Sequence, residues 1–516
     1  MTPSRVQKKG LDDMFSRSSG VLIHLSSLPG DYGIGSMGAE ARYFIDFLER
    51  SGVTYWQLLP LVPPGDGASP YMSPSSAAGN PLFIDLPSLM EDGLLTWRDL
   101  APNRYDEKDQ VNYTWVQQNH EKLLRRAFRN ASEQVRLQVD RYIDNDQELA
   151  DYALFQAIRD YFGRKLVEWP DIGLIRREPE ALEKYRTLLA EEVEYQKFCQ
   201  YLFAKQWQAL KKYANDRGIR IIGDIPFYVS LDSVDVWLRP ELFQVNPVTK
   251  VPDAVAGVPG DLFTPLGQLW GNPLYQWDVH RKDGYQWWCN RVRRTAQFFD
   301  VIRIDHFRGI HSYWSVPRDT EDALKGHWCP GPGMELIDAI RQQVPQAEFI
   351  AEDLGDIDEE THRFIANSGI PGIRVLVDAF TDLEGNSAFL PHHCIEDSVM
   401  YTGTHDTPTF IQWLEHIATD AQREYAESYL RLNRQEGLNW GMLAGAWGSI
   451  SSLVVAPMQD VLGLGAGARM NAPGTLGEFN WSWRVRREAL NEDVSARLRR
   501  LNQLYGRMPR WIEDEE

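Results

Sequence analysis

Acidic residues stand at or just after the ends of four short apolar runs, and they are the side chains best placed to do chemistry. The four motifs are Gly223-Asp224-Ile225-Pro226, Arg303-Ile304-Asp305-His306, Ala351-Glu352-Asp353-Leu354 and Thr404-His405-Asp406-Thr407. If the runs are strands of one parallel sheet, the motifs meet at the edge where the strands end. For any single motif, the alternative is that the acid only caps the helix that follows.

Carboxyl groups that converge in this way repel one another, and the repulsion leaves one of them protonated beside an ionised partner. Glycoside chemistry needs this combination. A carboxylic acid protonates the leaving oxygen, while a carboxylate attacks or stabilises the oxocarbenium-like carbon. The four motifs together therefore favour a site that acts on glycosidic bonds.

Basic and imidazole side chains adjoin two of these carboxylates. Arg303 and Asp305 are two residues apart on a predicted strand, so their side chains project to the same side. The guanidinium would hold the carboxylate ionised, as a nucleophile requires, although a structural ion pair explains the same spacing. His306 and His405 are suited to binding sugar hydroxyls. The alternative for each is a polar residue near the barrel rim that has no role in the chemistry. A metal site built from these residues is a third option, but no HExxH or EF-hand spacing supports it.

The strands that must position these residues are predicted from short, continuous apolar runs. There are eight such runs: Val21–Leu25, Tyr55–Leu61, Ile219–Ile225, Val301–Ile304, Phe349–Ala351, Ile373–Val377, Val399–Tyr401 and Leu453–Ala456. Continuous hydrophobicity is typical of parallel strands that are buried on both faces, and amphipathic stretches such as Ala39–Arg50 lie between many of the runs. The pattern predicts an α/β fold, a TIM (β/α)8 barrel, with a doubly wound sheet as the rival.

Uneven spacing between the runs predicts large insertions after strands 2 and 3 of a single barrel domain that spans residues 1–516. Residues 87–217 are expected to form a mainly helical inserted subdomain. Residues 231–300 are rich in Trp, Pro and Gly, which is typical of an irregular insertion over a site. Within it, Phe263, Trp270, Tyr275 and Trp277 suit either a lid with a stacking platform or an aromatic plug that seals the barrel mouth.

Composition excludes several classes of partner. The 54 basic and 73 acidic residues leave a net charge of −19, which repels phosphate backbones and argues against nucleic acid. No apolar run approaches the length of a membrane helix, so no membrane partner is expected. The aromatic content of 12% is high and hints at a ligand that stacks on rings.

Cofactor motifs are weak in this chain. Cys199, Cys289, Cys329 and Cys394 lie far apart without a CxxC pair, which argues against a zinc knuckle or a disulfide framework and favours a reducing, cytoplasmic location. The GxGxxG spacing of Gly33–Gly38 starts well after its strand ends, and the next strand closes without an acid to hold a ribose. We read these glycines as a tight turn and expect neither a cofactor nor a metal.

The motifs resemble those of the 4-α-glucanotransferases, the amylomaltase or disproportionating-enzyme family. Arg303–Gly309, Ile350–Gly355 and Gly403–Asp406 look like the catalytic strand-end motifs of that family. Further similar blocks follow in family order between about Gly20 and Arg484. They are Ser69–Tyr71, Ala78–Pro81, Gly223–Pro226, Val255–Pro259, Gly267–Pro273 and Arg469–Gly474.

The resemblance implies a retaining double displacement on α-1,4-glucans, in a TIM barrel related to that of α-amylases. By motif, Asp305 is the expected nucleophile, Glu352 the general acid/base and Asp406 the transition-state stabiliser. The expected substrate-binding residues are Tyr71, Asp224, Gln268, Trp270, Arg303, His306, His405 and Asn471. The expected substrates are malto-oligosaccharides or starch- and glycogen-type α-glucans.

Three points stay open at this stage. Some relatives carry a Tyr of a second glucan site within the segment Pro63–Ala68, but this chain has Gly65-Asp66-Gly67 there, so that site is not predicted. A plain α-glucan hydrolase would use the same carboxylates, and transfer additionally requires that water is kept from the intermediate. An inactive glucan-binding protein is the remaining alternative, and the complete set of three acids argues against it.

Overall fold

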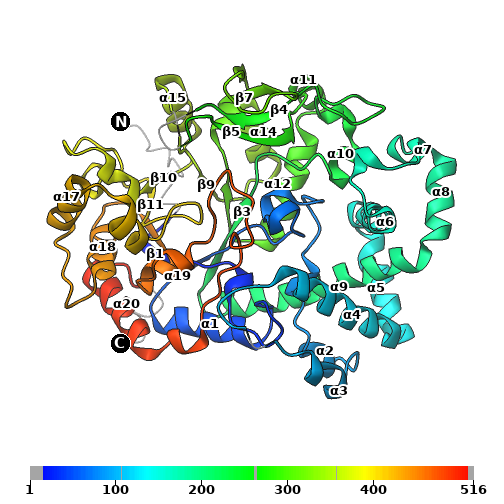
Figure 1. Ribbon diagram of the computed structural model, residues 1–516, viewed down its shortest axis with the longest axis horizontal. Coiled ribbons are helices and arrows are strands. Elements are labelled where there is room, and N and C mark those ends of the chain that lie inside the picture. The colour runs from blue at the N-terminus through cyan, green and yellow to red at the C-terminus, as the bar shows by residue number, and fades with distance from the viewer. Residues whose placement is uncertain (1–14, 106, 261–263, 356, 510–516) are drawn as a thin grey trace, which may run out of the picture.

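Eight parallel strands close into a barrel in the computed structural model, which describes residues 15–105, 107–260, 264–355 and 357–509 (Figure 1). The order around the barrel is β1-β12-β11-β10-β9-β6-β3-β2. The strands are β1 (Ser18–Leu22), β2 (Tyr55–Gln57), β3 (Arg220–Ile225), β6 (Val301–Ile304), β9 (Phe349–Ala351), β10 (Gly372–Val375), β11 (Ser398–Tyr401) and β12 (Leu453–Pro457). Each predicted apolar run overlaps one of these strands, and the TIM barrel is confirmed.

Helices around the outside of the barrel form its second layer. Those that connect or follow the strands are α1 (Ala39–Arg50), α12 (Gln286–Phe298), α13 (Arg308–His311), α14 (Met334–Gln343), α15 (Glu359–Ser368), α16 (Phe410–Gln412), α17 (Asp420–Leu430), α18 (Leu438–Trp447), α19 (Met458–Val461) and α20 (Glu492–Leu504). Between β10 and β11 the connection uses two 3-10 helices, Leu376–Thr381 and Pro391–His393. None of the described helices is long and apolar enough to cross a membrane.

The chain between β2 and β3 is built almost entirely of helices. They are α2 (Ser88–Glu91), α3 (Trp97–Leu100), α4 (Tyr113–Asn130), α5 (Glu133–Asp144), α6 (Gln147–Phe162), α7 (Ile172–Ile175), α8 (Pro179–Leu188) and α9 (Ala190–Asn215). Side chains of Asn112, Ser132 and Asp146 cap the first turns of α4, α5 and α6, which explains where these helices begin. Helices α4 to α9 lie together on one side of the barrel in Figure 1.

A second sheet, which the sequence did not predict, lies beside the barrel. Its order is β5-β4-β7-β8 and all its pairs are antiparallel. The strands are β4 (Ala254–Val258), β5 (Gln268–Pro273), β7 (Ser312–Pro317) and β8 (His327–Pro330), with α10 (Val234–Leu238) and α11 (Trp277–Lys282) nearby in the chain. The chain after β3 and the chain after β6 thus combine in one sheet. Residues 261–263, which include Phe263, are outside the described residues.

The glycines of the GxGxxG spacing lie where the chain approaches itself closely. A Cβ at Gly35 would come within 2.0 Å of the carbonyl oxygen of Leu25, and one at Gly38 within 2.1 Å of Asp85 Oδ1. The Asp85 carboxylate also accepts hydrogen bonds from Ser36 Oγ and Ser88 Oγ, at 2.7 and 2.6 Å. A carboxylate therefore lies at the start of α1, where a nucleotide phosphate would have to bind, and its charge repels phosphate.

Arg507 ties the C-terminal segment to the start of β1 and to the turn before β12. Its side chain is fully buried and donates five hydrogen bonds to the carbonyl oxygens of Ser18, Trp447, Ser449, Ser451 and Ser452. Burial lowers the pKa of Arg507 to about 9, so the guanidinium is still charged at neutral pH.

We expect Arg507→Met to lower the free energy of unfolding by about 4 kcal/mol, because it removes five hydrogen bonds of a buried guanidinium, although Arg17 and the backbone N–H of Ser18 still donate to three of the carbonyl oxygens. Urea unfolding followed by tryptophan fluorescence measures this change. Arg500→Met removes an exposed arginine from the adjoining helix α20 and serves as the control. An Arg507→Met midpoint equal to that of the control would contradict the prediction.

Candidate active site

Backbone hydrogen bonds of the barrel continue past the ends of three neighbouring strands and fix two of the candidate acids. Asp305 N donates to the carbonyl oxygen of Ile225 at 3.1 Å, and Glu352 N donates to that of Ile304 at 3.0 Å. Phe307 N in turn donates to the carbonyl oxygen of Glu352 at 3.0 Å. Asp305 and Glu352 therefore stand on rigid backbone at the carboxyl end of the barrel, where TIM barrels carry their active residues.

Arg303 bridges two of the carboxylates. Its Nη1 donates to Asp224 Oδ2 at 2.6 Å and to Asp305 Oδ1 at 2.9 Å. Burial alone lowers the pKa of Arg303, but the two carboxylates outweigh it and raise that pKa well above the ordinary value. Burial raises the pKa of Asp224, and Arg303 opposes this rise. The Asp305 side chain is 26% exposed, whereas those of Arg303 and Asp224 are 4% and 0% exposed, so Asp305 is the member of the trio that a ligand can reach.

Tyr71 extends this network to the acid that follows β11. It lies in a 3-10 helix, Pro70–Met72, and its hydroxyl donates to Asp224 Oδ2 at 2.8 Å. The same hydroxyl is 2.9 Å from His405 Nε2, so its oxygen accepts from that nitrogen. His405 Nε2 is also 3.4 Å from Asp406 Oδ2, and Asn471 Nδ2 donates to Asp406 Oδ1 at 2.6 Å.

Glu352 occupies a different environment from the other acids. Its Oε2 accepts from the backbone N–H of His306 at 2.7 Å and its Oε1 from that of Leu354 at 3.0 Å. Burial raises the pKa of Glu352 to about 7; the charge of Asp305 adds to the rise, while Arg303 and the two backbone donors oppose it. A carboxyl group that holds its proton near neutral pH is suited to general acid/base catalysis.

His306 connects the barrel to the second sheet. Its backbone φ is +48°, a left-handed conformation that costs free energy outside glycine and that directs its N–H to Glu352. Burial lowers the pKa of the His306 imidazole to about 4, so the ring is neutral at pH 7. Trp270 of β5 meets this ring edge-on at 4.9 Å between centroids, and Trp270 Nε1 donates to Gln268 Oε1 at 3.1 Å.

The structure thus brings all the predicted site residues together. Hydrogen bonds join five of them in sequence: Asp305, Arg303, Asp224, Tyr71 and His405. His405 Nε2 lies 3.4 Å from Asp406 Oδ2, and Asn471 donates a hydrogen bond to Asp406. Glu352 lies beside this chain through the backbone of His306, and Trp270 with Gln268 follows through the His306 ring. The described residues contain no group of three or more His, Cys, Asp or Glu arranged to hold a metal ion.

Sequence reasoning missed two residues that hold this network. Arg469 Nη2 donates to the carbonyl oxygen of Asp406 at 2.8 Å, and its Nε donates to that of Asn471 at 2.7 Å. Asp353 accepts from the backbone N–H of Ile373 at 2.7 Å, which ties the segment that carries Glu352 to β10. Both residues stand within the motifs quoted above, so a closer reading of those motifs would have found them.

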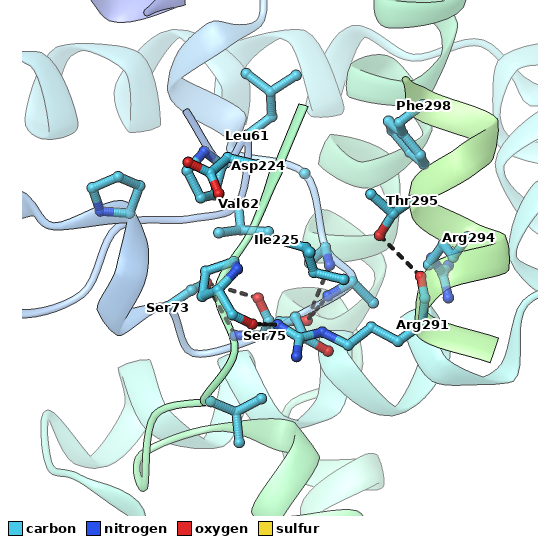
Figure 2. A pocket seen from close by; sticks show the side chains of 18 of the residues that line it. Leu61, Val62, Ser73, Ser75, Asp224, Ile225, Arg291, Arg294, Thr295 and Phe298 are labelled. Atoms are coloured by element: carbon cyan, nitrogen blue, oxygen red, sulfur yellow. Dashed lines mark hydrogen bonds between the residues drawn. The ribbon is translucent and has the colours of Figure 1, made fainter. Parts of the chain in front are cut away.

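Tyr71 and Asp224 are among the residues that line a small cavity, and Figure 2 shows this cavity with Asp224 labelled. Its volume is about 60 Å³, which is room for a few water molecules and too little for a glucose ring. Arg291 lines it and donates to the carbonyl oxygens of Pro226 and Phe227, at 2.7 and 3.3 Å. This arginine therefore holds the turn that follows Asp224, and a sugar ring must approach the carboxylates from outside the cavity.

A much larger groove of about 1590 Å³ is lined by residues close in sequence to some of the site residues, but not by the site residues themselves. Its lining includes Ala68, which is close in sequence to Tyr71, and the rings of Tyr105 and Trp115, whose centroids are 4.4 Å apart. Leu476 and Phe479 also line it and are 86% and 73% exposed. Exposed rings and apolar side chains along an open groove are suited to an extended ligand.

The raised pKa of Glu352 predicts a pH-dependent effect on stability. In the unfolded chain this carboxyl titrates near 4.5, whereas in the folded protein it titrates near 7. Between these two pH values the folded state binds more protons than the unfolded state. The contribution of Glu352 to stability is therefore complete below pH 4.5 and is lost as the pH rises to about 7. Glu352→Gln removes this loss, and the variant's free energy of unfolding relative to wild type should rise by about 3 kcal/mol from pH 4.5 to pH 8.

Urea unfolding of both proteins at several pH values measures that difference. Because Gln cannot accept both backbone hydrogen bonds, the variant starts from a disadvantage at low pH, and the change with pH is the quantity that matters. A difference that stays constant from pH 4.5 to pH 8 would show that Glu352 titrates normally in the folded protein.

Comparisons with known proteins agree on one family. Residues 23–490 match the family model described as 4-alpha-glucanotransferase. The chain is 42% identical over 491 residues to a 4-alpha-glucanotransferase of Clostridium butyricum, which covers 94% of this chain and 100% of the relative. It is 39% identical to a chloroplastic/amyloplastic 4-alpha-glucanotransferase of Arabidopsis thaliana, covering 95% of this chain and 86% of that protein.

Two solved structures share its fold. Amylomaltase from Streptococcus agalactiae in complex with acarbose matches with a TM-score of 0.93 and 41% identity, covering 96% of this chain and 100% of that one. Amylomaltase from Corynebacterium glutamicum matches with a TM-score of 0.77 and 20% identity, covering 94% of this chain and 75% of that one. The second match, at low identity, shows the fold alone.

Proposed function

This chain belongs to the 4-α-glucanotransferase family, and from that membership we propose how its own residues carry out the reaction. The enzyme transfers a segment of an α-1,4-glucan to the 4-hydroxyl of an acceptor glucose or glucan. The observation that carries the proposed mechanism is the pairing of a buried Glu352, with a pKa of about 7, and an accessible Asp305 held by Arg303. Such a pair supplies an acid and a nucleophile at the same pH.

The first displacement forms a glycosyl-enzyme. Asp305 attacks the anomeric carbon of the donor while Glu352 gives its proton to the glycosidic oxygen, which leaves as the 4-hydroxyl of the released sugar. Arg303 occupies Oδ1 of Asp305, and this leaves Oδ2 as the attacking atom. Asp406, oriented by Asn471 and His405, stabilises the positive charge that develops on the sugar ring.

The second displacement reverses these steps with a new partner. The 4-hydroxyl of the acceptor attacks the anomeric carbon, its proton passes to the Glu352 carboxylate, and the bond to Asp305 breaks. Two inversions give net retention of the α configuration. Tyr71 and His405 bind the donor sugar beside Asp305, while the buried Asp224 contributes by holding Tyr71 and Arg303. The neutral His306 with Trp270 and Gln268 contacts sugars on the other side of the cleaved bond.

Transfer rather than hydrolysis requires that the acceptor reaches the intermediate before water does. We propose that β5, which lies between β3 and α12 in the chain and carries Trp270 against the His306 ring, helps to exclude water there. The helical insertion of residues 87–217 contributes Tyr105 and Trp115 to the large groove. That groove supports malto-oligosaccharides and longer starch- or glycogen-type chains as substrates. The four unpaired cysteines support a reducing, cytoplasmic location.

Incubation of the pure protein with maltotriose tests the proposal. We expect a ladder of longer and shorter malto-oligosaccharides together with glucose, while the total number of reducing ends stays constant. Chromatography of the products and a reducing-end assay measure the two quantities. Growth of reducing ends at the rate of glucose release would identify a hydrolase, and binding of maltotriose without turnover would identify an inactive glucan-binding protein.

A further inference from the structure

Asp460 is a buried carboxylate outside the residues assigned to the reaction. It lies in α19, directly after barrel strand β12, and is 3% exposed. Its Oδ2 accepts from Thr402 Oγ1 at 2.8 Å, and its Oδ1 accepts from the backbone N–H of Phe410 at 2.8 Å. Thr402 and Phe410 flank residues 403–409, which we name the acid loop because it carries His405 and Asp406. One side chain therefore holds both ends of the acid loop.

Within the acid loop, short-range hydrogen bonds leave little freedom once its ends are held. Thr404 N donates to Thr407 Oγ1 at 2.9 Å, and Thr407 Oγ1 donates to the carbonyl oxygen of Thr404 at 3.2 Å. Asp406 N donates to Thr404 Oγ1 at 3.2 Å. A Cβ at Gly403 would come within 2.6 Å of Thr407 Oγ1, so the start of the loop is packed as well. The position of Asp406 thus depends on the two ends that Asp460 holds, together with the hydrogen bonds from Arg469 and Asn471.

Asp460 is itself anchored to the scaffold. Asn439 of α18 donates through Nδ2 to the carbonyl oxygens of Asp460 and Val461, at 3.1 and 2.9 Å. Burial raises the pKa of Asp460 to about 6, while the hydrogen bonds from Phe410 and Thr402 oppose that rise. Burial of a carboxylate costs free energy that an apolar residue would not cost. Two acceptor oxygens kept at this position in spite of that cost fit a role in placing the acid loop.

We propose that Asp460 is a positioning residue of the transfer reaction, which holds Thr402 and Phe410 so that the acid loop presents His405 and Asp406 to the sugar. The proposal rests on the stabilising role proposed above for Asp406. A displacement of about 1 Å at a reacting group lowers rates by about 100-fold. Loss of the Asp460 hydrogen bonds should therefore reduce transfer although Asp460 itself touches no substrate.

Three variants of the full-length chain separate the hydrogen bonds from the charge. Asp460→Ala loses both bonds, and we expect its kcat/KM with maltotriose to fall by about 10- to 100-fold. Asp460→Asn keeps both, because its amide oxygen accepts from Phe410 N while its amide nitrogen donates to Thr402 Oγ1, and it should recover to within about threefold of wild type. Thr402→Val loses one bond and should give an intermediate rate. Circular dichroism and melting curves check that each variant is folded.

A double-mutant cycle with Asp406→Asn decides whether Asp460 acts through the acid loop. In that background, Asp460→Ala should lower the rate by less than about twofold, because the stabilising carboxylate is already gone. α-Maltosyl fluoride, a donor with a good leaving group, keeps the slow variants measurable. If Asp460→Ala does not fold, the same cycle is run with Thr402→Val.

Two results would overturn the proposal. If Asp460→Ala lowers the rate equally in the wild-type and Asp406→Asn backgrounds, Asp460 does not act through the acid loop. If Asp460→Asn is as slow as Asp460→Ala, the two hydrogen bonds are not what the reaction needs from Asp460. A normal rate for Asp406→Asn alone refutes the proposed role of Asp406 instead, so the failure of the underlying mechanism is distinguished from the failure of this inference.

Discussion

Asp305→Asn should lower transfer from maltotriose by about 10⁴-fold or more, the largest effect expected of any single substitution in this chain. The amide has nearly the shape of the carboxylate but is uncharged and does not attack the anomeric carbon, so no glycosyl-enzyme forms. An α-maltosyl fluoride whose non-reducing 4-hydroxyl is replaced by hydrogen is a donor that cannot act as an acceptor. Incubation with this donor, followed by mass spectrometry of the intact protein, detects the intermediate. The wild-type protein should gain the mass of one deoxymaltosyl group and the variant should gain none.

A matched control separates loss of the nucleophile from loss of any carboxylate. Asp420→Asn makes the same change at a side chain that is 100% exposed, and it should transfer at the wild-type rate. An Asp305→Asn protein that still forms the deoxymaltosyl adduct would place the nucleophile on another carboxylate. Asp224 is then excluded by its complete burial, and Asp406, which is 43% exposed, becomes the candidate.

The barrel was predictable from sequence because its strands are buried on both faces. The boundaries of its strands and the presence of the second sheet were not predictable. Strand β1 begins at Ser18 instead of Val21, since its small residues read as polar although they are buried. A Cβ at Gly20 would lie 3.1 Å from that of Tyr55, so close packing of β1 on β2 selects glycine there. Strands β5 and β8 are partly exposed and contain Gly or Pro, and no continuous apolar run reveals them.

Residue 286 begins α12, although the sequence predicted an irregular insertion from 231 to 300. This helix is the last element before β6, so the barrel's own layer resumes inside the predicted insertion. Its amphipathic pattern was obscured by neighbouring Trp residues, which pack with Phe227 and Tyr275 into one aromatic cluster. Composition alone therefore did not separate a packed helix from a loop.

Candidate acids at strand ends could be predicted by a rule of topology, but residues on loops could not. Asp305 and Glu352 directly follow their strands, so parallel pairing alone brings them to one edge. Tyr71 and Asn471 reach the site from a 3-10 helix and from the chain after β12, and only the family resemblance pointed to them. Asp460 also follows a strand end, and the same rule applied to the eighth run would have included it.

Glu352→Gln should show the second largest effect, and the size should depend on the donor. With maltotriose we expect the rate to fall by about 10³-fold or more, because the sugar that leaves must receive a proton. With α-maltosyl fluoride, whose fluoride ion leaves without a proton, formation of the glycosyl-enzyme should stay within about tenfold of wild type. Glucose release and the mass of the protein adduct measure the two reactions. Equal losses with both donors would show that Glu352 does something other than give a proton.

The pH profile supplies an independent check, because it depends on the proton of Glu352 and not on its shape. With a pKa of about 7, the carboxyl is protonated below that pH and ionised above it. Only the protonated form can give its proton to the glycosidic oxygen, so kcat/KM of the wild type with maltotriose should fall about tenfold per pH unit above pH 7. The Glu352→Gln variant acting on α-maltosyl fluoride should lack this alkaline limb. A limb that persists in the variant belongs to another group, and the assignment of the acid would then be wrong.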